Sequence, residues 1–178
     1  MSGTAGSPGK SPRWVVDYTR RSRYRPPPGW YRRLQSLAPP ILRAGMGPGY
    51  AVVLEVPGRL SGKPHRVALV RVVHDEQQYL VSLTGESHWV RNVRAAGGHA
   101  VLTHRKTSRA VRLEEIPAEE RTPIILAYLH RAGRAQTRAA AREARIYFGV
   151  SSDPSAEEIH SIVNHYPVFH VVDLSPSN

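Results

Sequence analysis

At 178 residues, the chain has the length of one domain and can bury a hydrophobic core. It contains no cysteine, which excludes disulfide bonds and thiolate metal sites, and no apolar run approaches the roughly 20 residues of a membrane-spanning helix. Most of the net charge of +11 lies in residues 1–33, which hold eight basic side chains and one acidic, so the rest of the chain is only mildly basic.

Residues 1–28 are expected to form a basic, disordered N-terminal arm, because Gly, Ser and Pro dominate its composition. The arm also carries Trp14, Tyr18 and Tyr24 among its basic residues, a combination that suits nucleic acid or an acidic membrane surface. The near-balanced charge of residues 29–174 argues against such binding as the main function. We therefore expect a single domain at 29–174, in the cytoplasm, since the N-terminus lacks the apolar segment of a secretory signal.

The predicted domain begins with helical periodicity. Residues 30–38 are predicted to form a short helix, which Pro39-Pro40 interrupts, and a second helical piece is predicted to end at Gly45. The pattern then changes to strands that are rich in valine and bounded by turn residues. Six strands are predicted, at residues 50–56, 66–74, 79–84, 100–104, 110–116 and 168–172.

Helices and turns separate these strands. Residues 75–78 are predicted to connect two strands as a hairpin, and Ser87 is predicted to begin a short helix that Gly97-Gly98 ends. Helices are predicted at residues 88–96, 118–131, 134–146 and from Ser155. Glu158 completes a capping-box spacing with the start of the last one. Six strands with inserted helices predict an α+β, mainly β, small antiparallel barrel.

The segment from Gly58 to Arg66 is the strongest candidate for a ligand site. It lies between two predicted strands, and its two glycines would allow backbone N–H groups to converge on an anion. Its charged and hydroxyl side chains suit a phosphate, with which guanidinium groups form charge-assisted hydrogen bonds. These side chains are Arg59, Ser61, Lys63, His65 and Arg66. The alternative interpretation is a solvated basic hairpin loop without a ligand.

Two runs of sequence resemble a known family. The first is PGRLSGKPHRVALV, from Pro57, and the second is TGESHWVRNVRAAG, from Thr84. The first resembles the GRKSGxPRxxPL segment, and the second the later Trp and Asn motif, of the deazaflavin (coenzyme F-420)-dependent nitroreductase family. These proteins are related to the pyridoxamine-phosphate-oxidase-like flavoproteins. The resemblance covers residues 48–115 and implies a split β-barrel of about six antiparallel strands.

The resemblance also implies a cofactor and the residues that bind it. The cofactor would be coenzyme F-420, an 8-hydroxy-5-deazaflavin, with FMN as the alternative. Its phosphate and acidic tail would be held by Arg59, Ser61, Gly62, Lys63, His65 and Arg66. Thr84, Trp89 and Asn92 would lie along its ring or linker. For Trp89, core packing is the alternative interpretation.

The activity that this resemblance implies is an oxidoreductase that transfers hydride to a small organic acceptor such as a quinone, enone or nitro compound. Leu60, His65 and Ala68 depart from the family segment, which has Lys, Arg and Pro at these positions. The departures motivate an alternative, a module that binds flavin or heme without turnover, or an enzyme of the same fold recruited to a biosynthetic pathway. A homodimer is a further expectation, because split barrels often pair.

Other chemistry receives little support from the sequence. The nine histidines include no H-E-x-x-H motif and no pair spaced for one helical face, so we expect no metal site. The absence of a G-x-S-x-G elbow argues against a serine hydrolase of the α/β type. Tyr128 and Tyr147 are candidate proton donors for the reductase, although packing is the alternative role for each.

Overall fold

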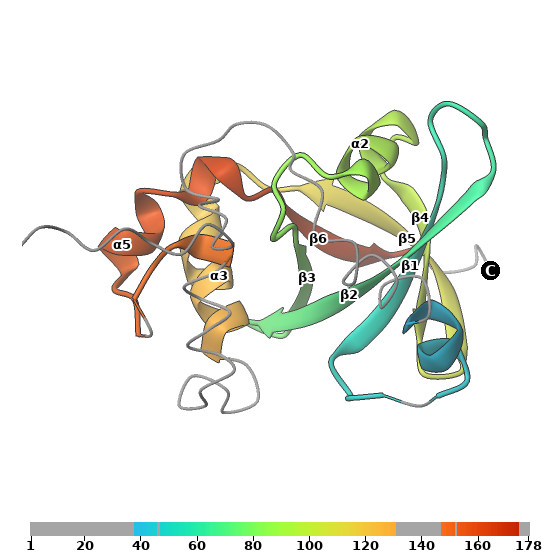
Figure 1. Ribbon diagram of the computed structural model, residues 1–178, viewed down its shortest axis with the longest axis horizontal. Helices are drawn as coiled ribbons and strands as arrows, with labels where there is room; N and C mark the ends of the chain where they lie inside the picture. Colours follow the sequence, from blue (N-terminus) through green and yellow to red (C-terminus); the bar gives the residue numbers. More distant parts are fainter. Residues whose placement is uncertain (1–37, 46, 131–146, 152, 175–178) are drawn as a thin grey trace, which may run out of the picture.

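The computed structural model describes residues 38–45, 47–130, 147–151 and 153–174. Within these ranges, six strands close into an antiparallel barrel, with a short helix over one end and helices along one side (Figure 1). This architecture confirms the prediction of an α+β, mainly β, split barrel with inserted helices.

The strands run around the barrel in the order β1-β2-β3-β6-β5-β4, and β4 pairs with β1 to close it. Each strand contains at least one valine, whose branched side chain favours extended backbone. Their bounds are β1 Ala51–Pro57, β2 Pro64–His74, β3 Gln77–Val81, β4 His99–His104, β5 Thr107–Glu115 and β6 Val168–Asp173.

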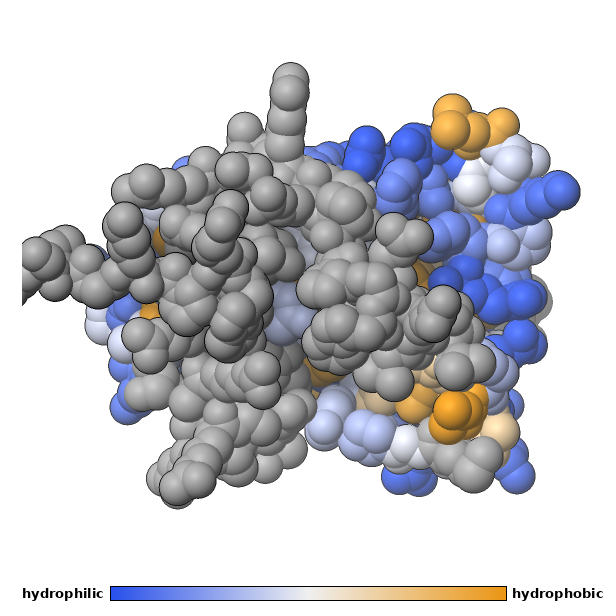
Figure 2. All heavy atoms as spheres, in the orientation of Figure 1, coloured by the Kyte–Doolittle hydropathy of each residue, from blue (hydrophilic) through white to orange (hydrophobic). Residues whose placement is uncertain are grey.

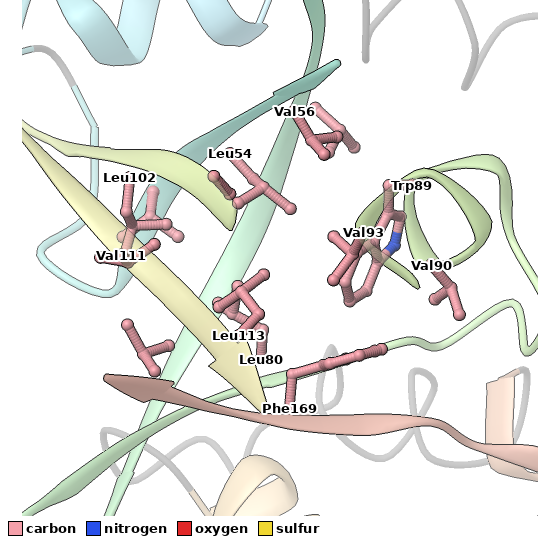
Figure 3. Close-up of a cluster of buried hydrophobic side chains, with 14 residues drawn as sticks. Leu54, Val56, Leu80, Trp89, Val90, Val93, Leu102, Val111, Leu113 and Phe169 are labelled. Carbon is pink, nitrogen blue, oxygen red and sulfur yellow. The ribbon is translucent and has the colours of Figure 1, made fainter. Parts of the chain in front are cut away.

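The first hydrophobic core fills the barrel. Successive side chains of a strand point to opposite faces, and in β6 Phe169 and Val171 point inward whereas Val168 packs on the outer face. The helix α2 (His88–Ala95) closes one end of the barrel, and Trp89 enters the core from it (Figure 3). The ring centroids of Trp89 and Phe169 are 5.3 Å apart, so helix and strand pack directly on each other.

A second core lies outside the barrel, between its β2-β3-β6 face and the remaining helices (Figure 1). Val72 and Val168 of the strands pack there with Ile125 and Phe148. These helices are η1 Ala118–Glu120, α3 Arg121–His130, α5 Ala156–His160 and η4 Val163–His165. The barrel wall between the two cores therefore carries apolar side chains on both faces, which explains its continuous apolar runs.

Two helix boundaries agree with the local signals in the sequence. Ser87 is the residue before α2, although its side chain makes no capping hydrogen bond, and Gly97 and Gly98, both with positive φ, follow the helix. At α5, the Ser155 hydroxyl accepts a hydrogen bond from the Glu158 N–H at 3.1 Å, as the capping-box spacing predicts. These signals are reliable because each acts within one helical turn.

The prediction of a strand at 79–84 after a four-residue connection is wrong in its position. The connection consists of Asp75 and Glu76 alone, with φ of 47° and 62°. Such a two-residue turn matches the twist of the paired strands, so β3 begins at Gln77. Thr84, predicted at the end of this strand, lies in the turn before α2.

The predicted interruption at Pro39-Pro40 is also wrong, because residues 38–43 are helical. The φ of proline fits a helix, and the Ala44 N–H still bonds to the Pro40 carbonyl at 3.1 Å. The arm at 1–28, most of the helix predicted at 30–38 and the helix predicted at 134–146 lie outside the described residues. None of the described helices combines the length and apolarity needed to cross a membrane.

Candidate functional site

The loop between β1 and β2 is an internally bonded hairpin. The Gly58 N–H bonds to the Lys63 carbonyl at 2.9 Å, and the Ser61 and Gly62 N–H groups both bond to the Gly58 carbonyl. The Lys63 N–H donates to the Ser61 hydroxyl at 3.3 Å. Because these four amides already have acceptors, the expected backbone nest does not form there, and a ligand at this loop would be held by side chains.

A hydrogen-bonded pair joins this loop to α2, 33 residues later in the chain. The Asn92 side-chain oxygen accepts from the backbone N–H of Arg59 at 3.3 Å and from its guanidinium at 3.1 Å. Asn92 is 3% exposed and is positioned by the helix that closes the barrel. The two runs that resemble the same family therefore meet in space.

Four basic side chains gather where the loop meets α2. Burial, followed by the charges of Arg91, Arg59 and His65, lowers the pKa of His88 below its ordinary value. His65 reaches this place because it is paired with Val56, a residue of the barrel core, and so lies on the inward side of β2. We call Arg59, His65, His88 and Arg91 the cationic rim.

Sequence reasoning missed His88 and Arg91. Both lie on α2, three residues apart and thus on one helical face, beside Asn92. That spacing was the only signal in the sequence, and it is informative only because the loop packs against the helix.

Leu60, at the tip of the loop, is 90% exposed, and the surface at the upper right of Figure 2 is otherwise largely hydrophilic.

Arg66 points away from the rim. It pairs with Glu55 across the β1-β2 ladder, and its guanidinium forms an ion pair with the Glu55 carboxylate. The alternation of the strand places it on the face opposite to the inward Val67. Phosphate binding by Arg66 would therefore compete with an existing ion pair.

Trp89 and Thr84 also lie in the second of the two runs. Trp89 is 5% exposed and packs against Phe169, so its indole serves the barrel core and presents little surface to a ligand. Thr84 is half-buried in the turn before α2. The contact between the run and the loop is thus made by Asn92, with Trp89 anchoring the helix that carries it.

The two tyrosines proposed as proton donors lie with the second core, whereas Trp89 belongs to the first. Tyr128 is 1% exposed and packs edge-on against Phe148, with ring centroids 5.9 Å apart. This burial leaves little of the Tyr128 side chain accessible to a substrate in solvent. Tyr147 is half-buried against the same core and stays the candidate of the pair.

No cluster of metal-ligating side chains occurs among the residues that the structure describes. Residues 30–146 match the sequence model of the F420H(2)-dependent quinone reductase family. The match spans more than half of the chain and includes both the loop and α2. The chain belongs to this family.

Solved structures of several proteins resemble this F420H(2)-dependent quinone reductase family member. A protein of unknown function from Agrobacterium tumefaciens is 13% identical, with a TM-score of 0.47 over 83% of this chain and 55% of its own. An F420-H2 dependent reductase (FDR-A) is 22% identical, with a TM-score of 0.42 over 68% and 93%. The Vibrio cholerae heme storage protein HutZ is 10% identical, with a TM-score of 0.48 over 72% and 84%. The chain thus spans little more than half of the Agrobacterium protein.

A comparison with curated proteins finds no match. The family assignment therefore rests on the sequence match over residues 30–146.

Proposed function

We propose that this protein uses reduced coenzyme F-420 to transfer hydride to a quinone or to a similar small acceptor, such as an enone or a nitro compound. The observation that carries this proposal is the hydrogen bond from Arg59 to Asn92, which joins the two family motifs at the cationic rim. The match to the F420H(2)-dependent quinone reductase family supports it.

The side chains at the rim fit the anionic part of this cofactor. Arg59 and Arg91 supply guanidinium groups, which form strong charge-assisted hydrogen bonds with phosphate and carboxylate oxygens. The rings of His65 and His88 can each donate an N–H hydrogen bond to an anion. Lys63 lies on the same loop and adds a further cation. Arg59, Arg91 and Lys63 thus supply positive charge, and the two histidines supply ring N–H donors, a combination that suits a phosphate and an acidic tail.

The bound reduced deazaflavin supplies the hydride. The protein's own contribution is to hold the charged end of the cofactor and to position it beside the closed end of the barrel. Asn92 orients Arg59 for this purpose. The apolar side chains of α2 around Trp89 pack in the barrel core and keep the helix in place; we call them the apolar plug. The acceptor also requires a proton, for which Tyr147 or a water molecule is the proposed source.

The proposal is tested by titrating the full-length protein with coenzyme F-420 and following cofactor fluorescence. Arg59→Ala should weaken binding about ten- to a hundredfold, because a charge-assisted hydrogen bond contributes roughly 1.5–3 kcal/mol. Thermal stability should change little, since Arg59 lies in an exposed loop. Arg112→Ala, which removes an exposed arginine from β5, is the matched control and should bind like wild type.

The Arg59–Asn92 pair provides a second arm of this experiment. If Asn92 acts by orienting Arg59, Asn92→Ala should weaken binding in the wild-type background and add little in the Arg59→Ala background. FMN is titrated in parallel, because its phosphate would engage the same side chains. Wild-type protein that binds neither cofactor at about 100 μM would contradict the reductase proposal and favour a cofactor-free enzyme of this fold.

A homodimer and a cytoplasmic location are further parts of this proposal, and they rest on the sequence. Sedimentation of the full-length protein measures the first, and fractionation of cells that produce it measures the second.

A further inference from the structure

The end of the barrel opposite α2 is lined by polar side chains. Arg71 on β2 pairs across the ladder with Leu80, and Arg109 on β5 pairs with Leu102. Both leucines belong to the barrel core, so both arginines occupy inward positions. We call the inward polar residues at this end the polar mouth; they are Arg71, Gln78, Arg109 and Asp173.

Arg109 has an ion-pair partner within the polar mouth. Its Nε lies 3.0 Å from an Asp173 carboxylate oxygen, and a second guanidinium nitrogen is 3.2 Å from the other oxygen. Its third nitrogen donates to the Gln78 side-chain oxygen at 2.6 Å. Asp173 therefore forms a bidentate ion pair with Arg109, which fixes the orientation of both side chains.

Arg71 lies beside this pair with a different partner. One of its guanidinium nitrogens donates to the Gly49 carbonyl at 3.3 Å, which is a neutral acceptor. Burial and the positive charges of Arg109 and Arg105 lower the pKa of Arg71 from its ordinary value. Arg71 is thus a half-buried cation whose charged neighbours repel it.

Two further basic side chains converge on Gly49. The His104 ring donates to the same Gly49 carbonyl at 2.8 Å. The Arg105 guanidinium comes within 3.8 Å of the place that a Cβ atom at Gly49 would occupy. Arg105 is held in the β4-β5 turn with φ of 54°, a conformation that is uncommon for residues other than glycine.

The balance of charge at this end is positive. Arg71 lies close enough to Arg105 and Arg109 for their charges to lower its pKa, whereas the carboxylate of Asp173 pairs with Arg109. Within the described ranges, no carboxylate lies at ion-pair distance from Arg71 or Arg105. Like charges in a partly buried place repel each other unless an anion lies between them.

We propose that the polar mouth, together with Arg105, binds a phosphate-type oxyanion at a site separate from the cationic rim. The planar guanidinium groups of Arg71 and Arg105 match the oxygen geometry of phosphate. A dianion satisfies this surplus charge better than a monocarboxylate does, because the attraction scales with the product of the charges.

This site lies at the far end of the strands that carry the loop. The seven residues of β1 separate Gly49 from the β1-β2 loop, a distance of about 20 Å at the rise of a β-strand. A phosphate at one site therefore does not contact the other, and the two sites can be tested independently.

The test is a titration of ¹⁵N-labelled full-length protein with inorganic phosphate, observed through the arginine Nε–Hε signals. We expect the Arg71 and Arg105 signals to shift saturably, and more strongly with phosphate than with acetate or chloride at the same ionic strength. Arg71→Gln should weaken phosphate binding at the mouth at least tenfold. Arg112→Gln, on the outer face of β5, should leave it unchanged.

Two further variants keep the test decisive. In Arg59→Ala protein, which loses the loop cation at the rim, the mouth signals should still titrate as in wild type. Arg105→Gln, in an exposed turn, replaces Arg71→Gln if the latter does not fold, and it should also weaken binding. Shifts that do not saturate, that chloride reproduces, or that persist unchanged in these mouth variants would overturn the proposal.

Discussion

Asn92 shows how a single buried residue positions a charged loop. Its side-chain oxygen accepts hydrogen bonds from both the backbone and the guanidinium of Arg59, while the residue itself is 3% exposed. A long exposed cation normally loses considerable conformational entropy when it is held in one geometry. Here the buried amide holds it before any ligand arrives, which should favour anion binding at the cationic rim.

The protonation of His88 should report directly on this rim. Burial, Arg91, Arg59 and His65 lower its pKa in the folded protein. The unfolded chain therefore binds the proton more readily. The contribution of His88 to stability is fully present above the ordinary histidine pKa of about 6.5 and is lost as pH falls through the lowered value. An anion bound beside His88 offsets the positive charges, so its pKa should rise and anion affinity should increase as pH falls.

Histidine NMR titrations of the protein, with and without inorganic phosphate, measure this change. His160 on α5 is the internal control, and its signals should not change when phosphate is added. An identical His88 titration with and without the anion would show that no ligand binds beside it.

At the scale of elements, α2 serves two purposes through its helical period. Trp89, Val90 and Val93 enter the barrel core (Figure 3). His88 and Arg91 lie at the rim, because residues three apart share a helical face. The same helix therefore closes the barrel and presents the basic side chains, so packing inside the barrel determines where the rim lies.

Trp89→Ala should destabilise the protein by about 3–5 kcal/mol, since it removes a buried aromatic side chain and leaves a cavity beside Phe169. Trp89→Phe should cost less, because it keeps part of the plug. Denaturant unfolding measures both changes. Val101→Ala, at a residue 37% exposed on β4, is the control and should cost less than about 1 kcal/mol. A similarly small loss of unfolding free energy for Trp89→Ala would mean that the packing of Trp89 does not hold α2 on the barrel.

At the scale of the whole molecule, two hydrophobic cores share the barrel wall. Arg121 of α3 links the helices to the end of β5. Its buried guanidinium donates to the backbone carbonyls of Ile116, Val163 and Tyr166 and pairs with Glu115 of β5. Burial lowers the pKa of Arg121 more than the neighbouring carboxylates raise it. The helical layer is thus joined to the barrel by a polar clamp as well as by apolar packing.

Deleting residues 1–28 should leave this assembly nearly intact. The segment is poor in apolar side chains and cannot offset the entropy of ordering, and the family match begins only at residue 30. We expect the melting temperature to change by less than about 5 °C, roughly 1–2 kcal/mol for a domain of this size. The deletion removes six basic and one acidic side chain, so the net charge falls from +11 to +6. A larger drop in melting temperature would show that the arm contributes to the fold.

Several elements could be predicted from the sequence because their signals are local. Valine-rich alternation located four of the six strands to within two residues, and it placed the start of β5 three residues late. The glycine signal located the end of α2, and the capping signal located the start of α5. The third strand was misplaced because the left-handed backbone at Asp75 and Glu76 shortens the hairpin. Neither residue is a glycine, so the turn carried no strong sequence signal.

Only part of the candidate site could be predicted from the sequence. The composition of the loop from Gly58 to Arg66 identified it as basic, and its resemblance to a family identified Asn92. The sequence did not show that Arg66 engages Glu55, because that contact depends on the β1-β2 register. Nor did it show the rim or the polar mouth, each of which joins residues far apart in the chain.

The sequence by itself thus determined the class of fold, the basic loop and the family, because periodicity, turn residues and motifs act over short stretches of chain. Only the tertiary structure decided which cations act together. Closure of the barrel brings Arg59 to α2 and Arg71 to Arg109, across separations of 33 and 38 residues. Electrostatic interaction depends on distance in space, and that distance is set by strand register and by the apolar plug, neither of which any single motif encodes.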